Sequence, residues 1–263
     1  MKIFLLVFIL FCSVYAKELI LGVVPQQSPL VLHQKWKPLV EELSKMTGLK
    51  IVFKTEASIP LFEKALYSGQ YDLAYMNPYH FVIANKKLGL QAALRADKMI
   101  QGVVVSKNLN RSELFEAQGG RFLFPAPKAF AATLLVKYEL KKKYKIDLEQ
   151  KFKVLYVNSH DSVYKGVARG IGVFGGGIVR TFNNLSDSRA KQSLSIVYRT
   201  DTYPSHPIGF HPKVSLEDQK KVQEAFLKIP NNIIEPLNIK KFITTSTSEY
   251  DIVKDLALEL GIY

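Results

Sequence analysis

Apolar and polar positions along the chain form short continuous apolar runs that alternate with amphipathic stretches. An apolar run of about four to eight residues predicts a buried strand, and apolar positions spaced three and four apart predict a helix. In the first hundred residues the pattern predicts strands at 18–24, 50–55, 71–76 and 90–97, and helices at 36–48, 59–70 and 78–89. Strands that alternate with helices favour a mainly parallel sheet with helices on both faces.

A second series of the same kind follows without a linker between them. Ser248 and Asp251 have capping-box spacing at the start of the last helix. The predicted strands lie at 101–107, 121–126, 152–158, 171–177 and 193–200, and the predicted helices include a long one from Ala129 and two at 215–229 and 248–261.

Two α/β series and a returning C-terminal segment predict two lobes joined by two crossings. We expect lobe 1 to comprise residues 17–100 and 201–263, and lobe 2 to comprise residues 101–200. The crossings are expected near 98–101 and 200–204. Ligands of open α/β sheets bind beyond the carboxyl ends of the strands, so both lobes are expected to face one ligand cleft that closes by a hinge.

The first sixteen residues have the pattern of a secretory signal peptide. Lys2 is followed by nine apolar residues, too few to span a bilayer, and Val14 and Ala16 are the small residues that precede a cleavage site. We expect cleavage after Ala16 and a periplasmic mature chain; a membrane anchor or a buried first strand is the alternative. Cys12 raises the possibility of a lipoprotein, although the bulky Phe11 before it disfavours lipidation.

Composition and charge reduce the number of functions that are possible for the chain. The chain carries a net charge of +13, and losing the signal peptide removes one lysine and the single cysteine, so disulfides and thiolate chemistry are not expected in the mature chain. A basic surface suits nucleic acid, anionic membranes or anionic ligands, and export argues against nucleic acid. The five histidines have no metal spacing, and no catalytic motif is present, so we expect no metal, no cofactor and no catalysis.

Four segments that follow predicted strands resemble a known family. They read SGQYDLAYMNPYHFVIA (68–84), RFLFPAPKAFAATLL (121–135), VNSHDSVYKGVARG (157–170) and YRTDTYPSHPIGFHP (198–212). With the opening LILGVVPQQSPL (19–30), they are similar to the substrate-binding proteins of phosphate, phosphite and phosphonate ABC transporters. The resemblance implies a two-lobed type II periplasmic binding protein fold, no catalysis, and capture of a small oxyanion for a membrane permease or a sensor.

The chain departs from that family at the helix start. The family has a Ser-Thr-Ser-Gly run there, which aligns with residues 129–132 of this chain, Ala-Phe-Ala-Ala. Backbone N–H groups at a helix start still attract anions, so Ala129, Phe130 and Ala131 remain expected ligand contacts. Thr133 is expected to add a hydroxyl and Lys128 a charge.

A second departure lies in GVFGGGIVRTFNN (172–184), a region that carries acidic residues in some family members. No acidic residue occurs here between Arg169 and Asp187. The three glycines at 175–177 permit close approach of the backbone to a ligand, and Arg180 offers a planar donor fork suited to oxyanions. The alternative is that the glycines form a turn and Arg180 a surface ion pair.

Three further residues complete the expected site. Tyr79 follows a strand and an Asn-Pro turn, although a packed tyrosine is an equal alternative; His160 opens a helix and can donate to an anion; Gln27 follows the first strand. We therefore expect a monomeric binding protein for a small anionic solute, partnered with an ABC permease. A module that signals to a membrane histidine kinase is the alternative, and an enzyme on the same scaffold a remoter one.

Overall fold

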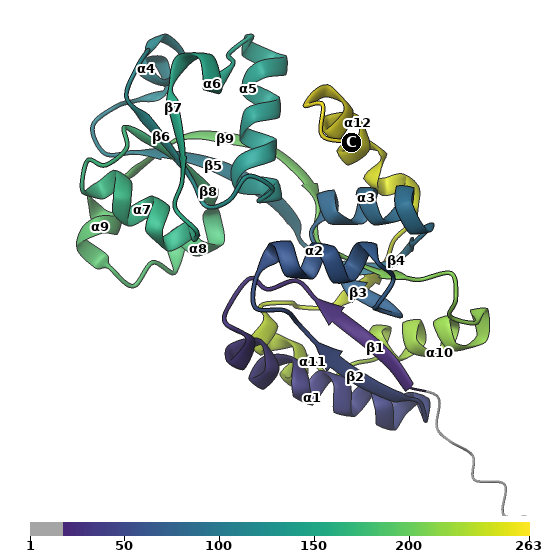
Figure 1. Ribbon diagram of the computed structural model, residues 1–263. Coiled ribbons are helices and arrows are strands. Elements are labelled where there is room, and N and C mark those ends of the chain that lie inside the picture. The colour runs from purple at the N-terminus through teal and green to yellow at the C-terminus, as the bar shows by residue number, and fades with distance from the viewer. Residues whose placement is uncertain (1–17) are drawn as a thin grey trace, which may run out of the picture.

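Two β-sheets organise the chain into two lobes in the computed structural model, which describes residues 18–263 (Figure 1). The first sheet has the strand order β11-β4-β10-β3-β1-β2. β1 pairs in parallel with β2 and β3, whereas β10 is antiparallel to β3 and β4, and β11 is antiparallel to β4. Its strands are β1 (Glu18–Val23), β2 (Lys50–Lys54), β3 (Leu73–Tyr75), β4 (Gln91–Ala96), β10 (Pro207–Phe210) and β11 (Phe242–Thr244).

The second sheet has the order β7-β6-β8-β5-β9. β6 is parallel to β7 and β8, and β5 is antiparallel to β8 and β9. Its strands are β5 (Met99–Ser106), β6 (Arg121–Phe124), β7 (Lys153–Tyr156), β8 (Phe174–Ile178) and β9 (Ser195–Pro204). The two-lobed α/β fold expected from the sequence is therefore confirmed, with the correction that both sheets are mixed rather than mainly parallel.

Helices cover the first sheet as their apolar stripes require. α1 begins earlier than its periodicity predicted, because Ser28 accepts a hydrogen bond from the N–H of Val31 and Pro29 suits a first turn. Gly48, at φ 71°, ends it as expected. The helical segments of this lobe are α1 (Pro29–Thr47), α2 (Ile59–Tyr67), α3 (Pro78–Leu88), α10 (Leu216–Leu227), α11 (Asn231–Ile234), η2 (Glu235–Leu237), η3 (Thr247–Tyr250) and α12 (Asp251–Glu259).

The last helix does not use the expected capping box. Ser248 lies inside the 3₁₀ segment η3, and α12 begins after Tyr250 without a side-chain cap. The hydroxyl of Ser248 instead pairs with that of Ser246 at 2.8 Å. The spacing of Ser248 and Asp251 was therefore a coincidence of sequence.

The second lobe has short helices around one longer one. The segment η1 (Phe130–Leu135) is a π-helical stretch that continues directly into α5 (Val136–Tyr144). Ser159 caps α7 by accepting from the N–H of Ser162, as a serine before a helix favours. The other helices are α4 (Arg111–Glu116), α6 (Leu148–Lys151), α7 (His160–Ala168), α8 (Val179–Asn183) and α9 (Ser188–Gln192).

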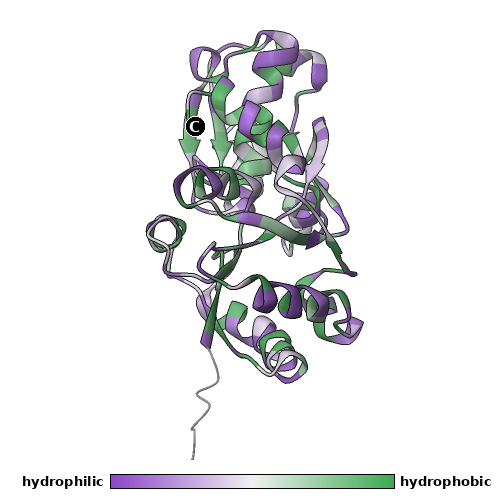
Figure 2. Ribbon diagram, turned by 90° about the vertical axis from the view of Figure 1, so that its right-hand side faces the viewer, coloured by the Kyte–Doolittle hydropathy of each residue, from purple (hydrophilic) through white to green (hydrophobic). Residues whose placement is uncertain are grey.

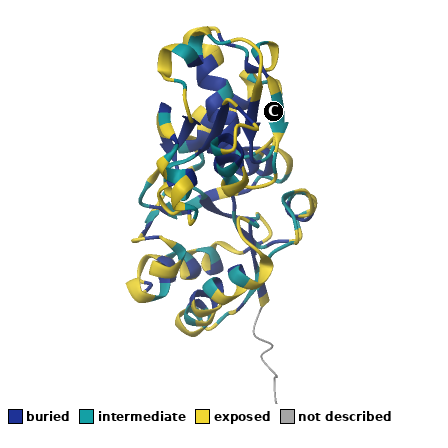
Figure 3. Cartoon of the chain, turned by 90° about the vertical axis from the view of Figure 1, so that its left-hand side faces the viewer, coloured by how far each residue is buried: buried dark blue, intermediate teal, exposed yellow. Residues whose placement is uncertain are grey.

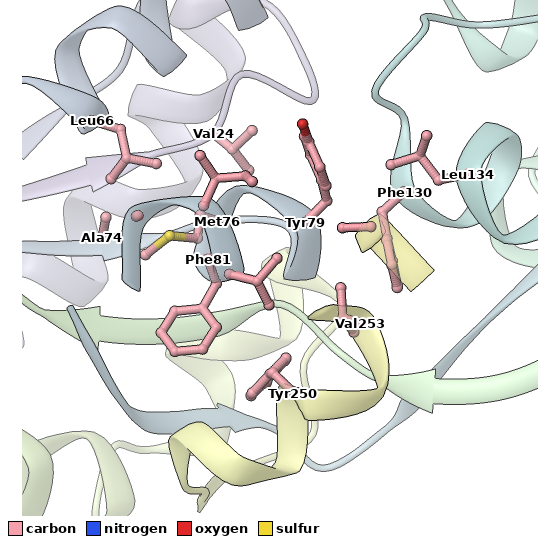
Figure 4. Packing of buried hydrophobic residues seen from close by; sticks show 14 of the residues in the cluster. Val24, Leu66, Ala74, Met76, Tyr79, Phe81, Phe130, Leu134, Tyr250 and Val253 are labelled. Atoms are coloured by element: carbon pink, nitrogen blue, oxygen red, sulfur yellow. The ribbon is translucent and has the colours of Figure 1, made fainter. Parts of the chain in front are cut away.

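The apolar strands form the centres of both lobes, and the polar residues gather on the outer helical faces (Figures 2 and 3). One core cluster joins the lobes. It packs Phe130 and Leu134 of η1 with Tyr79 of α3 and Val253 of α12 (Figure 4). The starting turn of η1 is thus anchored against the first lobe as well as the second.

The glycines of β8 hold η1 and α7 close to the second sheet. A Cβ added at Gly176 would lie 2.2 Å from the carbonyl oxygen of Ala132, and one at Gly177 would lie 2.1 Å from the hydroxyl of Tyr164. A Cβ at Gly102 on neighbouring β5 would lie 2.1 Å from the carbonyl oxygen of Ala131. The glycine run therefore serves packing inside a strand and does not form a turn.

The crossings between the lobes run side by side. Met99 pairs with Pro204, Ile100 with Tyr203 and Gln101 with Thr202, so the start of β5 and the end of β9 form one antiparallel ribbon. The expected lobe boundaries fall within these two strands, and they stay a prediction. Among residues 18–263, no helix is long and apolar enough to cross a membrane. The expected signal peptide lies outside the described residues.

Candidate functional site

Two adjoining cavities lie where the lobes meet, with volumes of about 640 and 470 Å³. They share seven lining residues, so we treat them as one cleft and name them the first and second cavity. Both lobes and the ribbon contribute to it. The shared residues are Val24, Gln26, Tyr75, His160, Ile178, Arg180 and Asn184.

Arg180 is an exposed arginine in the first turn of α8, and it lines both cavities. Its position is set by Ile178, whose N–H and C=O both bond to the hydroxyl of Tyr164 at 2.8 Å. No carboxylate among the described residues pairs with Arg180, which removes the surface-ion-pair alternative. The guanidinium therefore presents its donors to the cleft.

Two further cations line the first cavity, Lys98 before β5 and Arg199 on β9. Burial, and after it the charge of Arg180, lower the pKa of Lys98 to about 8. The Lys98 ammonium donates to the carbonyl oxygen of Asn238. Of the described residues that line the first cavity, none is acidic. Such a site attracts anions.

Two imidazoles flank Arg180. Burial, followed by the charge of Arg180, lowers the pKa of His160 to about 4, and the Nδ1 atom of His160 is buried without a hydrogen-bond partner. Burial, again followed by Arg180, lowers the pKa of His206 to about 3. His206 Nε2 lies 2.7 Å from Gln26 Nε2, and its ring stacks on Tyr75. Both imidazoles are neutral at pH 7 and can donate or accept hydrogen bonds without adding charge.

The start of η1 forms another side of the first cavity. Ala129 is its N-cap and supplies no side-chain hydrogen bond. The first N–H group that bonds within the helix is that of Thr133, which donates to Ala129 O at 2.9 Å. The N–H groups of Phe130, Ala131 and Ala132 precede it and have no partner inside the helix. These residues line the cavity, so the expected backbone donors lie at its wall.

The structure brings together six of the nine residues predicted for the site. Ala129, Phe130, Ala131, His160 and Arg180 line the first cavity, whereas Gln27 lines the second only, with Gln27 Oε1 accepting from Lys35 Nζ at 3.0 Å.

The other three predicted residues lie outside the cleft. Tyr79 is packed in the core and donates to Ile262 O at 3.0 Å, as its packed alternative allowed. Thr133 is fully buried and donates to Ala126 O at 2.8 Å. Lys128 lines a separate cavity of about 320 Å³ and pairs with Glu63.

Several lining residues were missed by the sequence prediction. Gln26 carried the available signal, because it follows β1 beside Gln27. Lys98 lies on one expected crossing and Arg199 directly precedes the other, and both crossings were treated as connections rather than as walls. His206 was considered only as one of the five histidines without metal spacing. The main missed residues are Gln26, Tyr75, Lys98, Asn183, Arg199 and His206.

The cleft has the composition of a binding site for a small solute. Among the described residues, no group of three or more His, Cys, Asp or Glu side chains could hold a metal ion. The three cations, the two neutral imidazoles and the free backbone donors together provide hydrogen-bond donors for an anion held between two lobes.

Solved structures of known proteins share this fold at low sequence identity. PhnD1 from Prochlorococcus marinus in complex with methylphosphonate aligns with a TM-score of 0.83 and 19% identity, over 94% of this chain and 100% of that chain. A binding protein component of an ABC phosphonate transporter from Pseudomonas aeruginosa aligns with a TM-score of 0.79 and 15% identity, over 93% and 86%. A histidine kinase sensor domain similar to periplasmic binding proteins aligns more distantly, with a TM-score of 0.53 and 10% identity, over 91% and 96%.

The comparison of sequences assigns the family. No curated protein matches the sequence. The family described as "ABC transporter, phosphonate, periplasmic substrate-binding protein" matches residues 21–250, which is most of the chain. The resemblance seen in the four segments after the strands is thereby confirmed, and the chain belongs to the family of periplasmic substrate-binding proteins of phosphonate ABC transporters.

Proposed function

We propose that this protein binds a small anionic ligand, a phosphonate or another oxyanion, in the periplasm and delivers it to an ABC permease. The observation that carries the proposal is Arg180, which faces the cleft without a carboxylate partner and shares the first cavity with Lys98 and Arg199. A charge-assisted bond from an arginine to an oxyanion is stronger than a neutral hydrogen bond. The family and the methylphosphonate-bound neighbour support the same ligand class.

The expected contacts follow from the cleft. Arg180 binds the anionic oxygens, the N–H groups at the start of η1 and the neutral His160 donate to them, and Gln26 and His206 approach from the first lobe and the ribbon. We propose this set in place of Tyr79, Thr133 and Lys128. No group in it is asked to perform chemistry, which agrees with a family of binding proteins.

A thermal-shift screen of the chain from Lys17 onward tests the proposal, with phosphate, phosphite, phosphonates, sulfonates, arsenic oxyanions and small carboxylates. A ligand at 100 times its dissociation constant stabilises a protein by about 2.7 kcal/mol. We expect at least one anion to raise the melting temperature, and Arg180→Met to remove that shift. Arg169→Met is the matched control, because Arg169 is an exposed arginine at the end of α7 and outside the cleft.

The proposal would be overturned if no anion raised the melting temperature, or if Arg180→Met and Arg169→Met showed equal shifts. The expected signal peptide, oligomeric state and lobe boundaries need separate experiments. Mass spectrometry of the exported protein checks cleavage after Ala16 and the absence of a lipid on Cys12. Light scattering checks the expected monomer, and separate expression of residues 101–200 checks the proposed lobe boundaries.

The second candidate function is sensing, which the kinase sensor-domain neighbour supports. In that case the closed protein would signal to a membrane kinase instead of releasing its ligand to a permease. Uptake of a radiolabelled ligand, compared between cells with and without the gene, separates the two. Loss of uptake supports transport, whereas unchanged uptake with a lost transcriptional response supports sensing.

A further inference from the structure

The first cavity combines a cationic side with an apolar one. Ile100 lies on β5 and Ile178 on β8, and the register pairs Ile178 with Gly102. Because residues two apart on a strand share a face, Ile100 and Ile178 lie on the same face of the sheet. Gly102 lets η1 approach that face, and η1 carries Phe130. We call Ile100, Phe130 and Ile178 the apolar wall; all three line the first cavity.

The apolar wall adjoins the cationic centre. Ile178 precedes Arg180 by two residues, and Lys98 precedes Ile100 by two. A ligand whose anionic oxygens meet Arg180 therefore extends its other end along the apolar wall. The acidic residue at the cleft, Asp161, lines the second cavity and not the first.

The size of the first cavity exceeds that of a bare oxyanion. Its volume of about 640 Å³ corresponds to about twenty water molecules at roughly 30 Å³ each. A tetrahedral oxyanion fills a small part of that space. The side chains of the apolar wall cannot donate hydrogen bonds, so oxygens directed toward them would lose their hydration without replacement.

We infer that the cleft selects anions with one uncharged apolar substituent over inorganic oxyanions and over anions that carry an ammonium group. The inference rests on the proposed anion-binding function and specifies the ligand class. The apolar substituent is desolvated against Ile100, Phe130 and Ile178. An ammonium at the same place meets the charges of Lys98, Arg180 and Arg199, and no carboxylate of the first cavity compensates.

The test uses pairs of ligands of equal shape in isothermal titration calorimetry at pH 7. The pairs are propylphosphonate with 2-aminoethylphosphonate, propanesulfonate with 2-aminoethanesulfonate, and butyrate with β-alanine. Each pair replaces a terminal methyl group by an ammonium and keeps the head group. Phosphate and methylphosphonate complete the series, because they lack the longer substituent.

We expect the alkyl member to bind at least tenfold more tightly than its amine partner in the pair whose head group the protein accepts. For a phosphonate head group, propylphosphonate should exceed methylphosphonate about tenfold, because two further methylenes are buried. Ile100→Thr should reduce that preference to about threefold or less, and Ile178→Thr provides a second variant at the same wall. Circular dichroism checks that both variants fold.

Equal binding within a pair, tighter binding of the amine member, or phosphate as the tightest ligand would overturn the inference while leaving anion binding intact. Absence of heat with every anion has a different meaning, because it removes the proposed function on which the inference rests. An undiminished alkyl preference in both folded threonine variants would also overturn the assignment to the apolar wall.

Discussion

Lys128 Nζ lies 2.9 Å from Glu63 Oε2, and this ion pair joins the loop before η1 in the second lobe to helix α2 in the first. The same carboxylate lies 3.2 Å from His80 Nε2. Asn77 Nδ2 donates to Lys128 O at 3.4 Å, so the backbone carbonyl and the side-chain ammonium of Lys128 both contact the first lobe. The charge expected to serve a ligand is thus compensated by the protein itself.

Replacing Lys128 tests that assignment. We expect Lys128→Met to change anion affinity by less than about threefold, because Glu63 already neutralises its charge, whereas Arg180→Met should lower affinity about 100-fold. Lys128 is half exposed, but Glu63 is only 12% exposed, so the loss of the lysine should also lower the free energy of unfolding. Calorimetric titration and urea unfolding provide the measurements, and a loss at Lys128 comparable to that at Arg180 would contradict the placement.

Anion affinity should fall as the pH rises through about 8. Lys98 loses its proton near that pH, whereas an ordinary lysine keeps it to 10.5. A bound anion favours the charged ammonium, so binding near pH 8 should take up protons. Titrations in HEPES and Tris reveal this uptake as a buffer-dependent heat.

In the unfolded chain Lys98 keeps its proton up to about pH 10.5. The folded protein therefore becomes more stable relative to the unfolded one as the pH rises from 8 toward that value. The matched variant is Lys98→Arg, which keeps the charge at every pH used. It should remove both the alkaline fall in affinity and the proton uptake. A fall that persists unchanged in Lys98→Arg would assign the titration to another group.

Gly176→Ala should destabilise the second lobe. Its Cβ would lie 2.2 Å from Ala132 O and 2.3 Å from the ring of Phe124, so η1 or β8 must move. Overpacking of this kind costs about 1 to 3 kcal/mol. Gly209→Ala is the control, since its nearest neighbour lies at 3.3 Å. Equal losses for the two variants in thermal unfolding would refute the packing role of Gly176.

Tyr164→Phe should weaken ligand binding in a protein that still folds. The lost hydroxyl bonds both to Ile178 N–H and to Ile178 C=O, which fix the backbone two residues before Arg180. Two neutral hydrogen bonds contribute about 1 to 3 kcal/mol in total. We expect about a tenfold lower anion affinity in a variant that is still folded at 25 °C. Tyr156→Phe is a control on a hydroxyl outside the cleft, and its affinity should match that of the unchanged protein.

The sequence predicted those parts of the fold that depend on local patterns. The apolar runs located most of the strands, the helix predicted to end at 48 ends there, and His160 opens a helix as expected. β10 and β11 were not predicted, because Pro207–Phe210 and Phe242–Thr244 are too short to show a period. Both pair antiparallel with β4, which made the first sheet mixed.

The candidate site was predicted where it follows a strand directly. Arg180 and His160 come immediately after β8 and β7 and line the cleft. Thr133 and Tyr79 were misplaced because the direction of a side chain on a helix depends on packing: Thr133 turns to Ala126 O and Tyr79 to Ile262 O. Those partners lie on segments whose contacts no local pattern reveals.

The ribbon of β5 and β9 that connects the lobes also forms a wall of the cleft, through Met99, Ile100, Gln101 and Thr202. A substitution in this wall therefore also alters the joint, the ribbon that connects the lobes. Substitutions at Val179 and Asn183 on α8 touch the same cavity without touching the joint. We expect descendants of this protein to acquire new ligands first through α8, with the ribbon preserved until later.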